Sequence, residues 1–183
     1  MEEMEAIRYG QVSTPGRYFG KPEHFLTAHL VFFAYLCSAK QNRQEYMQLT
    51  INLKEGVGDL RFGMPVESVV ALLGVADRVD TIDNATNETT TIMEYDDLEM
   101  TLFFEEENPV LASIGLRNEE ASLMGQHVFE LDEAAIVDLM AKAGYTETDC
   151  DDEDWGERRV SFPQANADLF FDAGELMSID LGA

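Results

Sequence analysis

The chain has 183 residues, a hydrophobic content of 45% and a formal net charge of −24 at neutral pH. That length accommodates one ordinary domain or two small ones sharing a core, and the hydrophobic content excludes disorder as the default. The charge argues against nucleic acid and anionic membrane surfaces as partners, because both would repel the chain. It is compatible with high solubility, with a basic protein partner, or with a halophilic or marine source.

The charge is unevenly distributed along the chain. Residues 1–46 hold five basic and five acidic residues, so the whole net charge of −24 falls on residues 47–183. This shift in composition predicts a boundary near Met47. We therefore expect an N-terminal extension over residues 1–46, in front of an acidic globular part.

Within the extension, the segment FLTAHLVFFAYLCSA (Phe25 to Ala39) is apolar on all sides. A helix over Phe25–Cys37 would be roughly 20 Å long, short of the roughly 30 Å of a bilayer core. The sequence therefore predicts no stable membrane span. Three interpretations stay open: an apolar helix packed on the fold or preceding it, a secretory signal, and a membrane helix.

Cysteine and histidine usage indicates no cofactor. The two cysteines, Cys37 and Cys150, form no CxxC pair, and His24, His29 and His127 lack the spacing of metal ligands. A reducing cytoplasm is the plainer localisation. If Phe25–Ala39 were a signal segment, the protein would instead be periplasmic or belong to the cell envelope.

Two stretches of the acidic part repeat one pattern. RFGMPVESVVALLG begins at Arg61, and VFELDEAAIVDLMAKAG begins at Val128. With Phe62–Phe104 set over Phe129–Phe171, only eight of forty-three positions are identical, so the argument rests on the shared apolar pattern. The pattern predicts two units, at residues 47–118 and 119–183.

Each unit is predicted to be one helix followed by antiparallel strands. Pro65 suits the first helical position and Gly74 the end of the first helix, while Asp132 is the expected N-cap of the second. The alternation in LEMTLFF and ADLFF predicts strands whose apolar residues face the helices, namely Leu102, Phe104, Leu169 and Phe171. The predicted fold class is α+β, with two tandem helix-plus-antiparallel-sheet repeats and an extra N-terminal helix.

The order of these motifs resembles two related families. The SmpA/OmlA outer-membrane-assembly lipoproteins hold one such unit, and the β-lactamase inhibitor protein holds two in tandem. The resemblance covers residues 57–181 and implies a shared fold. It rests on packing and turn residues: Gly63, Met64, Val69, Leu72, Leu73, Gly74, Tyr95, Leu102, Phe104 and Ile114.

Catalytic motifs are not found. His127 lacks a matching nucleophile and positioned carboxylate in any recognisable motif, and Cys150 lies in an acidic loop that disfavours its thiolate. An EF-hand loop beginning at Asp151 would need a carboxylate where Phe162 stands. We therefore predict that the protein is not an enzyme and carries no metal.

The loop TDCDDEDWGERR is the main candidate for partner binding. A lone tryptophan ringed by carboxylates suits a basic partner, with a solvated acidic loop as the alternative. A second charge run at the FFEEENP hairpin tip is a secondary candidate. The predicted partner-binding residues are Asp151, Asp152, Glu153, Asp154, Trp155, Glu105, Glu106 and Glu107.

These observations favour a non-catalytic, acidic protein-binding module, for example an inhibitor or immunity-type protein that masks a basic partner. The alternative is a cell-envelope assembly or scaffold protein anchored through Phe25–Ala39. No nucleic acid is expected as a partner in either case.

Overall fold

The structure is a computed structural model, and it describes residues 47–83, 89–105, 109–152 and 158–183. Contacts within the chain divide it into Met1–Cys37 and Ser38–Ala183, and every described residue belongs to the second unit. The predictions for Phe25–Ala39 lie outside the described residues.

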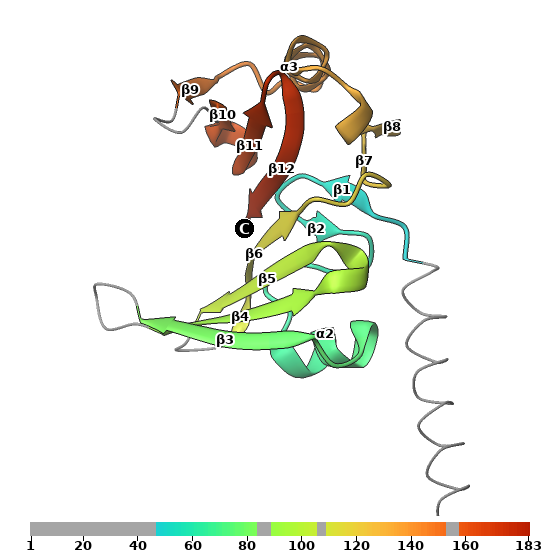
Figure 1. The fold of residues 1–183 in the computed structure, drawn as a ribbon, viewed down its shortest axis with the longest axis vertical. Coiled ribbons are helices and arrows are strands. Elements are labelled where there is room, and N and C mark those ends of the chain that lie inside the picture. Colours follow the sequence, from blue (N-terminus) through green and yellow to red (C-terminus); the bar gives the residue numbers. More distant parts are fainter. Residues whose placement is uncertain (1–46, 84–88, 106–108, 153–157) are drawn as a thin grey trace, which may run out of the picture. The chain divides into compact units, whose positions relative to one another are not determined.

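One eight-stranded antiparallel sheet organises the described chain (Figure 1). Its first half, green to yellow in Figure 1, runs β3-β4-β5-β6, and its second half, orange to red, returns as β12-β11-β10-β9. The halves join where β6 pairs with β12, with Ile179 opposite Leu116 and Leu181 opposite Ile114. The strands are β3 (Arg78–Asp83), β4 (Thr89–Tyr95), β5 (Met100–Glu105), β6 (Val110–Leu116), β9 (Asp149–Asp152), β10 (Arg158–Phe162), β11 (Ala167–Asp172) and β12 (Glu175–Gly182).

A second sheet of four short strands has the order β2-β1-β7-β8. Its strands are β1 (Thr50–Asn52), β2 (Gly56–Val57), β7 (Ser122–Leu123) and β8 (Gln126–His127). β1 and β7 are parallel, with Ile51 opposite Leu123, so the chain before the first helix contacts the chain after β6.

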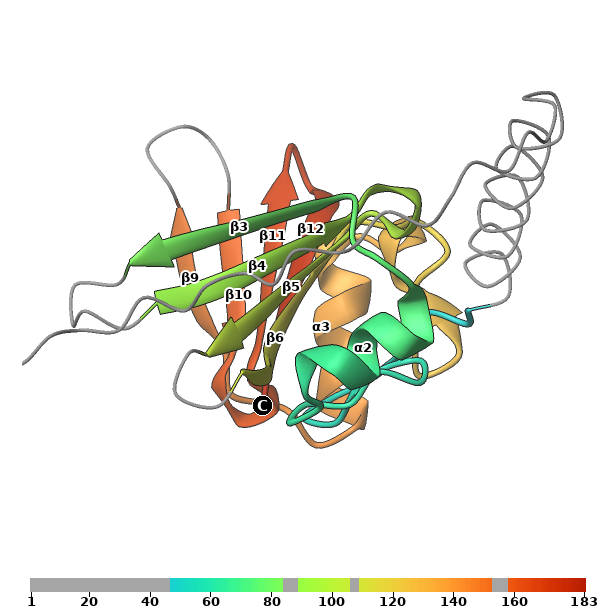
Figure 2. The ribbon, with the colours of Figure 1, turned by 90° about the horizontal axis from the view of Figure 1, so that it is seen from below.

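Two short helices cover one face of the large sheet (Figure 2). α2 (Val66–Leu73) begins after Pro65, which is its N-cap rather than its first residue, and Gly74 is its C-cap. α3 (Glu133–Lys142) begins at the predicted N-cap, because the Asp132 side chain accepts a hydrogen bond from the Ala135 backbone N–H at 2.8 Å. The described residues also include three short 3₁₀ turns: η1 (Asp96–Leu98), η2 (Val128–Glu130) and η3 (Pro163–Ala165).

The core lies between the helices and the inner face of the large sheet. Val69 of α2 and Ile136 of α3 are fully buried against it. The inner-face residues predicted from alternation are buried as expected: Leu102, Phe104, Leu169 and Phe171. One contiguous core therefore serves both halves of the sheet.

The predicted fold class is wrong. The described chain is mostly β: strands form a four-stranded and an eight-stranded sheet, and the two α-helices span only eight and ten residues. It is not an α+β fold of two tandem helix-plus-sheet repeats. The apolar pattern identified local elements correctly, but it holds no information on which strands become neighbours, and it missed the pairing of β6 with β12 and the whole small sheet.

Among the described residues, no helix combines the length and apolar character needed to cross a bilayer.

A candidate binding surface on the open face of the sheet

The large sheet has a second face, directed away from α2 and α3, which we call the open face (Figure 2). Side chains alternate between the two faces of a strand, so the residues between the buried ones point here. They include Glu94, Thr101, Phe103, Gly115, Asp168, Phe170, Ser178 and Asp180.

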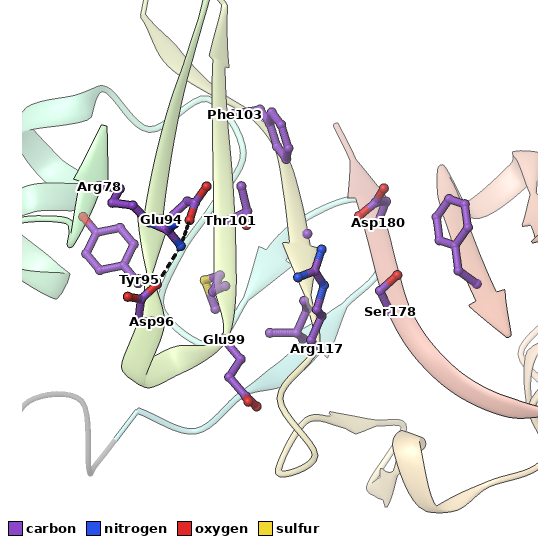
Figure 3. Close-up of a pocket in the computed structure, with 14 residues that line it drawn as sticks. Arg78, Glu94, Tyr95, Asp96, Glu99, Thr101, Phe103, Arg117, Ser178 and Asp180 are labelled. Atoms are coloured by element: carbon purple, nitrogen blue, oxygen red, sulfur yellow. Dashed lines mark hydrogen bonds and ion pairs between the residues drawn. The ribbon is translucent and has the colours of Figure 1, made fainter. Parts of the chain in front are cut away.

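A hollow of about 480 Å³ lies on the open face where the two halves of the sheet meet. Figure 3 shows it bordered by side chains from β4, β5, β6 and β12, with Arg117 just beyond the end of β6. Its lining combines two arginines, four carboxylates and two phenylalanines: Arg78, Arg117, Glu94, Asp96, Glu99, Asp180, Phe103 and Phe170.

Gly115 forms part of the floor of the hollow, opposite Asp180 on β12 and Thr101 on β5. A Cβ atom at this position would lie 3.1 Å from Asp180 Oδ1 and 3.8 Å from Phe103 Cε2. The absence of a side chain at Gly115 therefore leaves the space that the carboxylate and the ring border.

Two carboxylates face each other across the second half of the open face. Asp168 on β11 stands directly opposite Asp180 on β12, and we call these two residues the acidic pair. Like charges directly opposite each other in a sheet are destabilising. Although Asp180 is exposed, desolvation by the surrounding protein raises the pKa of its carboxyl, and Asp168 raises that pKa further, whereas Arg117 lowers it.

At the other end of the hollow, an arginine has carboxylate partners within the chain. Arg78 on β3 forms an ion pair with Glu94 on β4, and its guanidinium also lies 3.3 Å from Asp96 of η1 (Figure 3). The Asp96 backbone N–H in turn donates to the Asp77 carboxylate at 3.0 Å. Arg78 thus has carboxylate partners from its own chain, unlike the acidic pair, whose members oppose each other.

Phe103 and Phe170 are half-buried residues of the open face that line the hollow. Each precedes a fully buried phenylalanine, Phe104 or Phe171, at a β-bulge. The bulge changes the register of each strand at this point. The hollow therefore contains an aromatic side chain from each half of the sheet.

The structure describes three of the predicted partner-binding residues, Asp151, Asp152 and Glu105, and these three do not form one cluster. Asp151 and Asp152 lie on the edge strand β9, where Arg159 approaches Asp151 at 3.0 Å and Arg158 approaches Asp152 at 2.8 Å. Glu105 is exposed at the end of β5, and four other strands separate β5 from β9. Glu106, Glu107, Glu153, Asp154 and Trp155 lie outside the described residues.

Sequence reasoning missed the acidic pair and the hollow. Asp168 and Asp180 each stand between two apolar residues of an alternating segment, in ADLFF and LMSIDL, and this was the available signal for an outward-facing carboxylate. Their opposition depends on the register of β11 against β12, which alternation alone does not fix.

Within the described part of the chain, no three His, Cys, Asp or Glu side chains are grouped so that they could hold a metal ion. Cys150, the described cysteine, is exposed on β9 with a free thiol.

Comparison with known proteins gives little further guidance. No family model matches the chain, and no curated protein matches it. A solved structure of an extracellular protein containing an SCP domain, from Bacillus anthracis str. Ames, is similar at 16% sequence identity and a TM-score of 0.40. The match covers 66% of this chain but 43% of that one, and at this level of similarity it carries no argument about fold or function. The resemblance to the β-lactamase inhibitor protein and the SmpA/OmlA family stays a prediction from the sequence.

Proposed function

We propose that the protein is a non-catalytic binding module that docks a basic protein partner on the open face of its large sheet. An inhibitor or immunity-type role, in which the module masks a basic surface of another protein, is the form of this function that we favour. The observation that carries the proposal is the acidic pair, two opposed carboxylates beside a hollow lined by aromatic rings.

The acidic pair is expected to destabilise the sheet, so the needs of folding alone do not account for it. Directly opposed Asp168 and Asp180 repel each other, and a polar, uncharged residue at either position would remove that repulsion. A cationic partner group would convert the same arrangement into an attractive one. Departures from local stability rules of this kind are concentrated at functional sites.

The charge of the whole chain supports the same class of partner. A net charge of −24 attracts basic proteins over distances of about 10 Å at moderate salt, and it repels nucleic acid. Phe103 and Phe170 add half-buried aromatic side chains, a residue class that is enriched at protein interfaces relative to the rest of the surface.

Affinity capture from the source cells, compared between variants, tests the proposal. The double variant Asp168→Asn/Asp180→Asn removes the acidic pair, and Asp59→Asn/Asp138→Asn removes two exposed carboxylates outside the open-face set. A genuine partner is retained by wild type and by the control variant, and it binds the acidic-pair variant roughly two- to thirtyfold more weakly at low salt. Equal retention by both variants would show that the open face is not the docking surface.

A further inference from the structure

The hollow beside Gly115 offers a cation a carboxylate on one side and an aromatic ring on another. Asp180 Oδ1 and Phe103 Cε2 lie 3.1 Å and 3.8 Å from the position of the missing Cβ atom. Asp168 stands directly opposite Asp180, and Phe170 lines the same hollow.

We propose that this hollow receives one arginine side chain of the partner, with its guanidinium held by the acidic pair and its flat face against Phe103 or Phe170. This inference rests on the proposed function and names the group that the open face recognises. Arginine fits better than lysine because a planar guanidinium can stack on a ring while its edge donates hydrogen bonds to carboxylates. A lysine ammonium is a strongly hydrated point charge that makes fewer such contacts.

Of the two arginines that line the hollow, Arg117 gives the proposal its sharpest test. Arg117 is exposed, lies just beyond the end of β6 and interacts electrostatically with Asp180. It should compete with an incoming cation for Asp180. If the hollow instead bound an anion such as a carboxylate, Arg117 would be the attracting group, so its removal has opposite effects on the two classes of ligand.

The experiment is an amide NMR titration of the full chain at low salt with four acetylated and amidated peptides. Each peptide has one central residue, arginine, lysine, glutamine or glutamate, between glycine pairs. We expect the arginine peptide to shift the amides of Thr101, Gly115, Phe170 and Asp180, with weaker binding of lysine and none of glutamine or glutamate.

Two charge variants with matched controls follow. Asp180→Asn should weaken binding of the arginine peptide roughly two- to fivefold, and Arg117→Gln should strengthen it by a similar factor, as expected for exposed ion pairs. Asp138→Asn and Lys142→Gln change the net charge equally on α3, outside the open face, and should have smaller effects. A thermal melt of each variant verifies that it is folded.

Three outcomes would overturn the inference: equal binding of the glutamine peptide, equal binding of the lysine peptide, or weakened binding in Arg117→Gln. The proposed function would survive any of them if capture of a protein partner still depended on Asp168 and Asp180. Conversely, if capture were independent of the acidic pair, the proposed function would fail, whatever the peptides did.

Discussion

In the first half of the large sheet, β4 and β5 are joined by η1 and by Glu99 in the left-handed region, at φ 46°. In the second half, β10 and β11 are joined by η3 and by Asn166 at φ 48°. Both halves place a bulge between two phenylalanines, at Phe103/Phe104 and at Phe170/Phe171. The local turns and the inner faces of the two halves thus agree.

The open faces of the two halves differ. The first half pairs its charges, with Arg78 bound to Glu94 and Asp96. The second half also pairs Arg159 of β10 with Asp151 of β9, but in addition it opposes Asp168 to Asp180. Because the inner face must fit a close-packed core, its residues are constrained, whereas the open face can diverge at little cost in packing. The two halves therefore differ in the charges of their open faces, although their inner faces agree.

The largest effect is expected when a buried phenylalanine is truncated in either half, and the comparison tests whether the two halves contribute equally to the core. Phe104 and Phe171 are 0% and 2% exposed, so Phe104→Ala and Phe171→Ala should each lower the free energy of unfolding by about 3–5 kcal/mol. Urea denaturation followed by circular dichroism measures this loss. Phe103→Ala and Phe170→Ala on the open face are the matched controls and should cost less. A loss below about 1 kcal/mol for either buried ring would mean that its half is packed differently.

The sequence predicted the inner face of the sheet well but not its assembly. Alternation alone identified the burial of Phe104 and Phe171, because the period of two along a strand is a local property. The pairing of β6 with β12, and that of β1 with β7, joins segments distant in sequence, and many such pairings satisfy the same pattern. The class prediction failed for this reason.

The candidate site was even less accessible from the sequence. The acidic pair arises from the register between β11 and β12, and the hollow requires Gly115 to come beside Asp180 across the junction of the halves. Conversely, Asp151 and Asp152 form a charge run in the sequence, yet each lies beside an arginine of β10 in the structure. A count of acidic residues does not reveal which carboxylates already have a partner.

The two halves also differ in one hydrogen bond, which a tyrosine forms in the first half. The Tyr95 hydroxyl donates a hydrogen bond to the Gly74 carbonyl at 3.1 Å, whereas Phe162 occupies the corresponding strand end in the second half. Tyr95→Phe should therefore lower the free energy of unfolding by about 1 kcal/mol. Tyr145→Phe, outside the large sheet, is the matched control. An unchanged stability in Tyr95→Phe would show that this hydrogen bond adds nothing beyond packing.

The same tyrosine predicts an alkaline transition. Burial, followed by the negative charge of Asp77, raises the pKa of Tyr95 from 10.0 to about 12. Since the folded state holds this proton more tightly, the associated stability is complete below pH 10 and is lost as the pH rises towards about 12. Between these pH values, the free energy of unfolding measured by urea denaturation should fall more steeply with pH in wild type than in Tyr95→Phe. Equal slopes in the two proteins would contradict the attribution of this loss of stability to Tyr95.

The edge strands of the two halves, β3 and β9, should differ in what protects their amides from hydrogen exchange. Arg158 joins β10 to β9 through Asp152 and to α3 through Glu133, and these hydrogen bonds raise the pKa of its guanidinium above the ordinary value. Arg158→Gln should therefore speed hydrogen exchange of the β9 amides and of the first turn of α3. Mass spectrometry of exchanged peptides measures this change. Arg78→Gln, which removes contacts to β4 and η1 only, should speed exchange at β3 and leave α2 unaffected.

The smallest expected effect concerns the acidic pair in the absence of any partner. Asp180→Asn removes the repulsion from Asp168, so it should stabilise the fold at neutral pH by a few tenths of a kcal/mol, about the size of one exposed cross-strand pair. The pKa of Asp180 is raised above 3.8 in the folded state, so the wild-type carboxylate destabilises the fold at neutral pH, and this penalty disappears as the pH falls towards that value. The stability difference between Asp180→Asn and wild type should accordingly be largest near pH 7 and should shrink in acid. Asp138→Asn, on the exposed side of α3, is the control with the same change in net charge. If Asp180→Asn were instead destabilising at neutral pH, Asp180 would be a residue that stabilises the sheet. The acidic pair would then contain no net repulsion for a cationic partner to offset.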